Sequence, residues 1–446
     1  MGYGSMVLGI QRLTFGIIAC RMQEKTIGLE PSLEMGACFR ICFGFQRLIF
    51  GIIGLLVTPL FILRTAFRII LEDARGKETQ PSKVLRWSEE LKGSVSTLLA
   101  WVADVPVYVA ELAPTHSWSS RLFQYSYPQH FEAIQLKIPN EENLTICMVA
   151  ARHETYQRSS NMTVILVPGM FNTASMSIFV DLACRIYYQW GANVVVANMR
   201  GHGDTGRISQ DIPCSLTLRE GKDIVEIGRY LKREWGADQS IVLLGMSLGG
   251  TCALSAVLED SKQHGNSLLF DACAMISSPM DIGGLMHRMS TMKLTPESFN
   301  IWYAFYHWLL LRYASLRGLS SDIRCFRSFV KHAVIPFYTP EEAALIAEKA
   351  SPVHRLHFLK TPALAIYARD DPVTTLRESS TLLQKSQKCR KDALLRMEIC
   401  DHGGHAGHFA INSTETSSLV HNFFLQSVDK KRIRTKDTRV LPNTLS

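Results

Sequence analysis

The sequence predicts an α/β fold in which a mostly parallel sheet is flanked by helices on both faces. From about Phe131 onward, short runs rich in β-branched and other apolar residues alternate with helical stretches. These runs are almost continuously apolar, which is typical of strands buried on both faces. In open sheets of this kind, ligands bind beyond the carboxyl ends of the strands. We therefore expect the reactive residues to gather at that edge.

The expected elements follow one another in a regular order. The strands are FEAIQLKI (131–138), LTICMVA (144–150), MTVILV (162–167), ANVVVAN (192–198), SIVLLG (240–245), ACAMIS (272–277), ALAIYA (363–368) and LLRMEIC (394–400). Helices are expected near 176–190, near 219–235 and over TCALSAVLED (251–260). Helices between successive strands act as crossovers, and crossovers make the joined strands parallel.

Length and composition limit the possible functions. The chain has 446 residues, 47% hydrophobic and 20% charged, which excludes a wholly disordered or collagen-like protein and allows one large domain with additional segments. The net charge of +8 comes without a basic stripe interleaved with aromatics, so nucleic acid is not an expected partner. Eleven cysteines without a CxxC pair predict neither a disulfide framework nor a zinc ribbon. We read them as mostly reduced thiols, which favours a reducing, cytoplasmic compartment for the catalytic domain.

Residues 1–75 form a hydrophobic N-terminal region for which we expect membrane association. Residues 48–63 read LIFGIIGLLVTPLFIL, sixteen residues without a charge, just short of the roughly 20 of a typical bilayer span. An internal repeat supports a separate role, because GIQRLTFGIIA at Gly9 and GFQRLIFGIIG at Gly44 differ at only three positions. The alternative is a pair of apolar helices packed on the catalytic domain. Whether the segments span the bilayer or lie flat on it stays open.

The remaining boundaries follow from shifts in composition. Residues 76–130 are expected to form a linker with helices, and residues 131–427 the catalytic domain, with a cap at about 281–350. Within this cap, IWYAFYHWLLLRYASLRG from Ile301 either lines an apolar acyl pocket or packs on the core. Residues 428–446 are basic and poor in apolar residues, so we expect a flexible tail.

The segment Gly245-Met246-Ser247-Leu248-Gly249 stands directly between an expected strand and an expected helix. A tight turn there leaves no room for side chains at Gly245 and Gly249, and it exposes the Ser247 hydroxyl at a helix N-terminus. This context predicts that Ser247 is a nucleophile. The alternative is an ordinary helix-capping serine.

A serine nucleophile needs a base, and the base needs a carboxylate to orient it. Strand 363–368 is followed by Asp370 and Asp371, and strand 394–400 by three histidines at 402, 405 and 408. His405 is the favoured base, since Gly403 and Gly404 before it form a loop that can approach Ser247; His402 and His408 are the alternatives. A metal site on the three histidines is disfavoured, because two glycines interrupt the helix that would present them on one face.

Acyl transfer also requires N–H donors for the developing oxyanion. The backbone N–H of Leu248, directly after the nucleophile, is the first candidate. The loop Pro168-Gly169-Met170-Phe171 follows the strand 162–167 and offers the N–H of Met170 as the second. The alternative for this Pro-Gly pair is a simple turn.

Five segments in the same order carry a resemblance to a known family. They are PGMFN at 168, NMRGHGDT at 198, GMSLGG at 245, ARDDPV at 368 and HGGHAGHF at 402. Over residues 131–425 the chain resembles the alpha/beta-hydrolases, and more narrowly their YheT-like branch. The resemblance implies Ser247 as nucleophile, His405 as base and Asp371, with Asp370 as the rival, as the triad acid. Members of the branch are esterases or lipases, and some transfer acyl groups to alcohols.

Together these patterns predict a membrane-associated serine hydrolase that cleaves carboxylic esters, lipid acyl esters in particular, without a cofactor. One alternative is an acyltransferase that uses the same triad and an alcohol acceptor. The other is a non-enzymatic membrane adaptor built on this fold, for which the repeat in residues 1–75 would supply the docking segment.

Overall fold

The computed structural model describes part of the chain. It covers residues 127–439 except 140, 154–160, 171, 210, 213, 264–266, 292–327, 329, 338, 340, 342–349, 370, 372, 375, 390–393, 402, 406 and 410–412. The expectations for residues 1–75, for 76–126 and for the aromatic segment from Ile301 therefore lie outside the described residues. Within the described ranges, no helix is both long and apolar enough to cross a bilayer.

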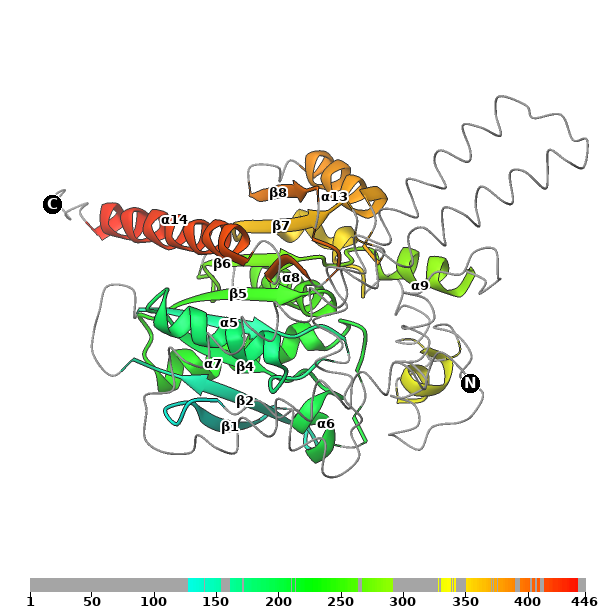
Figure 1. Cartoon of the computed structure of the whole chain (residues 1–446), viewed down its shortest axis with the longest axis horizontal. Coiled ribbons are helices and arrows are strands. Elements are labelled where there is room, and N and C mark those ends of the chain that lie inside the picture. Colours follow the sequence, from blue (N-terminus) through cyan, green and yellow to red (C-terminus); the bar gives the residue numbers. More distant parts are fainter. Residues whose placement is uncertain are drawn as a thin grey trace, which may run out of the picture.

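An eight-stranded sheet forms the centre of the molecule, and all eight expected strands are present (Figure 1). The strands are β1 (Glu132–Lys137), β2 (Thr145–Ala151), β3 (Met162–Val167), β4 (Asn193–Ala197), β5 (Ser240–Met246), β6 (Ala272–Ile276), β7 (Ala363–Ala368) and β8 (Leu395–Cys400). Their order in the sheet is β1-β2-β4-β3-β5-β6-β7-β8. The β1-β2 and β2-β4 pairs are antiparallel, and every other pair is parallel. The predicted mostly parallel sheet is thus confirmed.

The helices expected from the sequence are present as α5 (Ser177–Tyr188), α7 (Glu220–Glu234) and α8 (Leu248–Gln263). The structure adds the helices α6 (Gly203–Ile208), α9 (Ile282–Thr291), α13 (Leu376–Lys388) and α14 (Ser413–Arg439). Shorter helical turns are η1 (Val330–Val334), η2 (Ile335–Phe337), η3 (Pro352–Phe358) and η4 (Gly407–Phe409). Residues 428–439, within the expected tail, continue α14 as helix. Their lysines and arginines have good helix propensity even where no apolar face is present.

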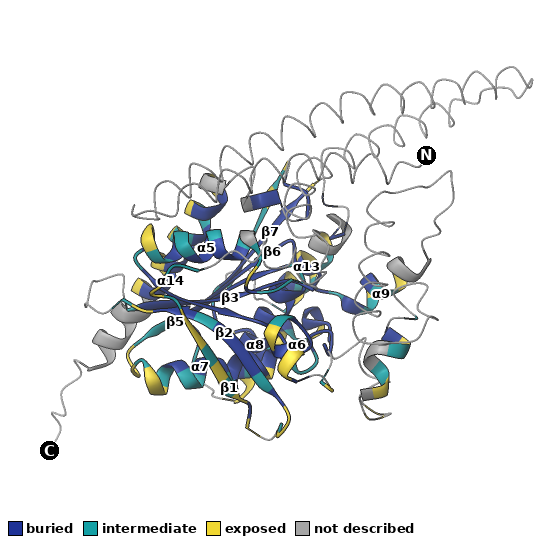
Figure 2. Ribbon diagram, turned by 60° about the horizontal axis from the view of Figure 1, so that its bottom comes forward, coloured by how far each residue is buried: buried dark blue, intermediate teal, exposed yellow. Residues whose placement is uncertain are grey.

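Two hydrophobic clusters cover the two faces of the sheet. On β3, Ile165 and Val167 pack into one cluster with α7 and α8, whereas Val164 and Leu166 pack into the other with α5 and α14. Figure 2 shows the buried strands between these two helical layers. The alternation follows from the period of two in a strand and explains why the strands are apolar at nearly every position.

The sheet has a topological switch point between β3 and β5. From β3 the chain goes to β4 on one side, and it later returns to place β5 on the other side. Such a reversal leaves a crevice beyond the carboxyl ends of the two strands, where ligands of open α/β sheets bind. The loop after β3 and the turn after β5 meet at this crevice.

Candidate active site

Ser247 lies in the tight turn between β5 and α8. Its backbone takes the left-handed conformation, with φ of 52°, which few non-glycine residues adopt. Two hydrogen bonds hold the turn: the Ser247 N–H donates to the carbonyl oxygen of Ile276 at 2.8 Å, and the Gly250 N–H donates to that of Ser247 at 3.0 Å. The half-buried side chain is thereby directed away from the sheet at the start of a helix.

The two glycines of the turn are required by close backbone contacts. A Cβ atom at Gly245 would lie 2.4 Å from the Gly249 carbonyl oxygen, and one at Gly249 would lie 2.2 Å from that of Val167. Backbone atoms cannot yield as a flexible side chain can, so any larger residue would displace the turn. The predicted reason for glycine at these positions therefore agrees with the geometry.

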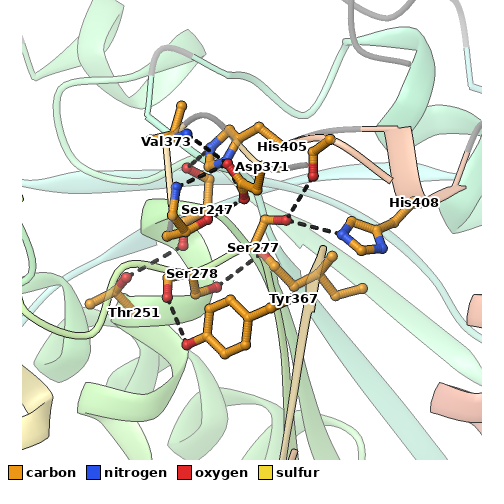
Figure 3. Close-up of polar contacts among 12 residues, drawn as sticks. Ser247, Thr251, Ser277, Ser278, Tyr367, Asp371, Val373, His405 and His408 are labelled. Carbon is orange, nitrogen blue, oxygen red and sulfur yellow. Dashed lines mark hydrogen bonds and ion pairs between the residues drawn. The ribbon is translucent and has the colours of Figure 1, made fainter. Parts of the chain in front are cut away.

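The structure brings His405 to Ser247 (Figure 3). His405 Nε2 lies 2.8 Å from Ser247 Oγ, although the two residues are 158 positions apart. The loop after β8 reaches the site with Gly404 in the left-handed conformation, at φ of 56°. His408 does not contact Ser247; it contacts Ser277 instead. His402 lies outside the described residues.

Asp371 completes a chain of hydrogen bonds with His405. Both of its carboxylate oxygens lie 3.1 Å from His405 Nδ1, and the carboxylate is fully buried. The backbone N–H groups of Val373 and Thr374 donate to Oδ1 at 2.7 and 2.9 Å, and the Thr374 hydroxyl donates to Oδ2. These donors replace the hydrogen bonds to water that the carboxylate loses on burial, and they hold it in place beside His405. Asp370 lies outside the described residues.

The two candidate oxyanion donors lie beside Ser247. The loop after β3 packs tightly on the turn, since a Cβ atom at Gly169 would lie 3.0 Å from Ser247 Cβ. Met170 and Leu248 both line the same pocket as Ser247. Among the described residues, no acceptor is paired with the backbone N–H of either one. Both groups are therefore available to a ligand.

An apolar pocket opens next to the Ser247 hydroxyl. Apart from the serine itself, its lining consists of apolar residues from five separate segments of the chain: Met170, Leu216, Leu248, Pro279, Ile282, Leu285 and Val373. Ile282 and Leu285 belong to α9, so the start of the expected cap contributes to the pocket. Such a lining favours a hydrocarbon group over a charged one.

The loop before α7 presents Leu216 to this pocket in a strained conformation that the sequence did not indicate. Leu216 and Thr217 both have positive φ, 53° and 84°. Buried Glu220 anchors the loop, because its carboxylate accepts the Ser215 N–H at 2.6 Å and the Ser215 hydroxyl. The Thr217 hydroxyl donates to the carbonyl oxygen of Ala350. Strain of this kind persists only where the surroundings hold it, and it is frequent at functional sites.

The histidines of the 402–408 segment do not converge on one point within the described structure. His405 contacts Ser247 and Asp371, whereas His408 contacts Ser277. No group of three or more His, Cys, Asp or Glu side chains suited to a metal ion occurs among the described residues. Chemically, the described part of the site offers a hydroxyl paired with a histidine that a carboxylate orients, and two N–H groups without a described acceptor.

The sequence matches one family model. The model described as the alpha/beta hydrolase fold matches residues 163–410, more than half of the chain. This range includes Met170, Ser247, Asp371 and His405. No curated protein matches the sequence.

A comparison with solved structures finds several that are similar to this chain at low sequence identity. The esterase Pf2001 of Pyrococcus furiosus is 15% identical with a TM-score of 0.45, covering 66% of this chain and 93% of that one. An acylaminoacyl peptidase of Pyrococcus horikoshii is 16% identical with a TM-score of 0.43, covering 67% and 42%. A puromycin-hydrolysing peptidase of Mycobacterium tuberculosis is 15% identical with a TM-score of 0.46, covering 67% and 39%. One fold can host different substrates, so the substrate must be argued from the site itself.

Proposed function

Because the chain belongs to the alpha/beta hydrolase fold family, we propose that it is a serine hydrolase that cleaves carboxylic esters with Ser247 as the nucleophile. The observation that carries the proposal is the unbroken hydrogen-bond chain from Ser247 Oγ through His405 to Asp371. A serine hydroxyl is a weak nucleophile unless a base accepts its proton, and this chain supplies an oriented base.

In the first half of the reaction, Ser247 Oγ attacks the carbonyl carbon of the ester, and its proton passes to His405 Nε2. The carbonyl oxygen becomes an oxyanion, which the N–H groups of Met170 and Leu248 stabilise. His405 then donates the proton to the alkoxy oxygen as the bond between that oxygen and the carbonyl carbon breaks. The alcohol leaves, and an acyl-enzyme on Ser247 remains.

In the second half, His405 Nε2 accepts a proton from a water molecule, whose oxygen attacks the acyl carbon. The same N–H groups hold the second oxyanion. The proton returns to Ser247 Oγ as the acyl bond breaks, and a carboxylic acid leaves. Throughout, the Asp371 carboxylate holds the His405 ring and stabilises its charged form.

The substrate proposed is an ester with an apolar acyl chain. The pocket beside Ser247 has an apolar lining, and burying each methylene group of a chain is worth about 0.8 kcal/mol. Each added carbon should therefore raise kcat/KM about fourfold until the pocket is filled. The same preference is consistent with our further proposals that the protein belongs to the YheT-like branch and that its substrates are lipid acyl esters.

The nucleophile is tested by labelling with a fluorescent fluorophosphonate, which reacts covalently with activated serines. Wild type and Ser247→Ala are compared with Ser386→Ala, which removes a buried hydroxyl of α13 that donates to the carbonyl oxygen of Leu383 in the same helix. We expect labelling of wild type and Ser386→Ala and none of Ser247→Ala. Labelling of folded Ser247→Ala would contradict the assignment, and no labelling of folded wild type would favour the non-enzymatic adaptor.

The substrate class is tested with nitrophenyl esters of increasing acyl length on wild type and Leu216→Ala. Shortening Leu216 enlarges the pocket, so the optimum should move to longer chains. A rate independent of chain length, or faster cleavage of amides than of esters, would refute the apolar ester assignment. Added glycerol separates the rival transferase activity, because an acyltransferase would release glycerol esters in place of free acid.

We further propose that residues 1–75 hold the enzyme at a membrane, where lipid esters are found. The uncharged run at 48–63 and the repeat at Gly9 and Gly44 support this. The test is flotation of full-length protein and a variant lacking residues 1–75 with phosphatidylcholine vesicles. The full chain should float and the shortened one should not; equal distribution of the two would exclude the anchor.

A further inference from the structure

The carboxyl end of β6 contacts both halves of the candidate site. Its last residue, Ile276, accepts a hydrogen bond from the Ser247 N–H at 2.8 Å, which fixes the nucleophile turn. The next residue, Ser277, has a left-handed backbone with φ of 49°. Its N–H donates to the Ile366 carbonyl oxygen on β7 at 2.9 Å. This residue is therefore fixed to the sheet, and its side chain is free to contact the loop above.

The Ser277 side chain faces the loop that carries His405 (Figure 3). Its hydroxyl oxygen lies 3.1 Å from His408 Nε2 and 3.4 Å from the carbonyl oxygen of Gly404. The His408 ring also supports the same loop by contact, because a Cβ atom at Gly403 would lie 2.8 Å from His408 Cε1. His408 and Ser277 are both fully buried. His405 lies between Gly404 and His408 in the chain.

The direction of the hydrogen bonds follows from the groups involved. The Gly404 carbonyl oxygen can only accept, so the single hydroxyl proton of Ser277 is donated to it. Ser277 Oγ must then accept from His408, whose Nε2 carries the proton. Burial lowers the pKa of His408 to about 4, so the ring is neutral at physiological pH. The neutral ring with its proton on Nε2 agrees with the bonding pattern.

We propose that Ser277 and His408 are positioning residues that fasten the His405 loop to the end of β6, and so set the distance between His405 Nε2 and Ser247 Oγ. This inference rests on the proposed function, in which His405 is the base. Ile276 holds the nucleophile turn and Ser277 holds the base loop. Two adjacent residues thus link the serine and the histidine through one rigid strand end.

Three variants test the pair. Ser277→Ala removes the shared hydroxyl, His408→Ala removes the ring, and His408→Gln places an amide nitrogen near the position of Nε2. We expect kcat to fall about tenfold to hundredfold in the two alanine variants, because misplacing a catalytic group by about 1 Å can cost about a hundredfold. KM should stay within twofold, and His408→Gln should recover most of the lost kcat. Ser386→Ala is the matched control and should keep wild-type kcat.

Coupling between the two residues distinguishes positioning from general stability. Since both act through one loop, the double variant Ser277→Ala/His408→Ala should lose no more kcat than the worse single variant. The proposal would be overturned if the kcat losses of the two single variants multiplied in the double variant, if only KM changed, or if both single variants kept wild-type kcat.

Hydrogen exchange tests the anchor without any substrate. Amides of residues 403–409 should exchange at least about tenfold faster in Ser277→Ala than in wild type, while those of α7 stay unchanged. Unchanged exchange at 403–409 would refute the anchor. If wild type does not react with fluorophosphonate, the proposed function fails, and the exchange rates still decide whether Ser277 holds the loop.

Discussion

Replacing Asp371 by Asn exchanges one carboxylate oxygen for an amide group of nearly the same size. Oδ1 of Asp371 accepts two backbone N–H groups, at 2.7 and 2.9 Å. In Asn, the amide oxygen must keep this place, since an NH2 group there would face two donors. The NH2 group then takes the place of Oδ2, 3.1 Å from His405 Nδ1. The amide oxygen also lies 3.1 Å from Nδ1, but it is already paired with two N–H groups, so the NH2 group donates to Nδ1 and shifts the ring proton onto Nε2.

A ring protonated on Nε2 cannot accept the proton of Ser247, so general-base catalysis is lost while the fold is retained. In serine proteases the same exchange lowers kcat by about ten-thousandfold. At about 1.36 kcal/mol per tenfold change, this corresponds to about 5 kcal/mol of transition-state stabilisation. We expect a loss of this order for Asp371→Asn, and little loss for Asp370→Asn.

The assay compares kcat/KM for a short-chain nitrophenyl ester and the rate of fluorophosphonate labelling in wild type and both variants. The melting temperature reports whether each variant is folded. A loss of less than about tenfold in folded Asp371→Asn would refute the reasoning, because a misdirected tautomer cannot be nearly harmless. A large loss in Asp370→Asn alone would identify that residue as the orienting carboxylate.

Three further outcomes are expected. Gly249→Ala should lower the unfolding free energy by about 1–3 kcal/mol or more and abolish labelling, because its Cβ would lie 2.2 Å from the Val167 carbonyl oxygen; an unchanged melting temperature would contradict this. Burial lowers the pKa of His408 to about 4, so this side chain binds a proton more readily in the unfolded chain. The free energy of unfolding of wild type should therefore fall by up to about 3 kcal/mol between pH 6.5 and 4. Urea titrations of His408→Gln should lack this part of the fall. Asp223→Asn breaks a buried ion pair in which two Arg200 nitrogens lie 2.6 and 2.8 Å from the carboxylate oxygens. Urea titrations should show a free energy of unfolding lower by about 3–5 kcal/mol, while fluorophosphonate labelling of the folded fraction stays unchanged.

The strands and the nucleophile turn were predictable because local patterns determine them. A strand buried on both faces must be apolar along its length, and a turn as tight as that at Ser247 admits only glycine at 245 and 249. β8 was predicted as well, although alternate residues of that strand are polar. The same reasoning did not predict the helical course of residues 428–439, because no apolar periodicity marks them.

The supporting residues of the site could not be predicted for a different reason. Ser277, Thr374 and Glu220 are ordinary polar residues in sequence. Ser277 gains its role from a partner brought close by the sheet, whereas Thr374 and Glu220 contact partners three and five positions away in local turns. Ser277 contacts a residue 131 positions away. Thr374 is close in sequence to Asp371, and the short Asp-x-x-Thr spacing is the one signal that could have identified it as a donor to the carboxylate.

The sequence separation of the three central residues affects when reactivity arises during synthesis. Ser247 precedes Asp371 and His405 along the chain, and His405 follows the last strand of the sheet. A nascent chain that has emerged only as far as β6 already contains the whole turn around Ser247, but it lacks the proton acceptor. Pairing of distant strands is also the slow part of folding. On the proposed triad, the newly made protein should not react with fluorophosphonate until its final strand has joined the sheet, and covalent labelling of Ser247 should report the completion of folding.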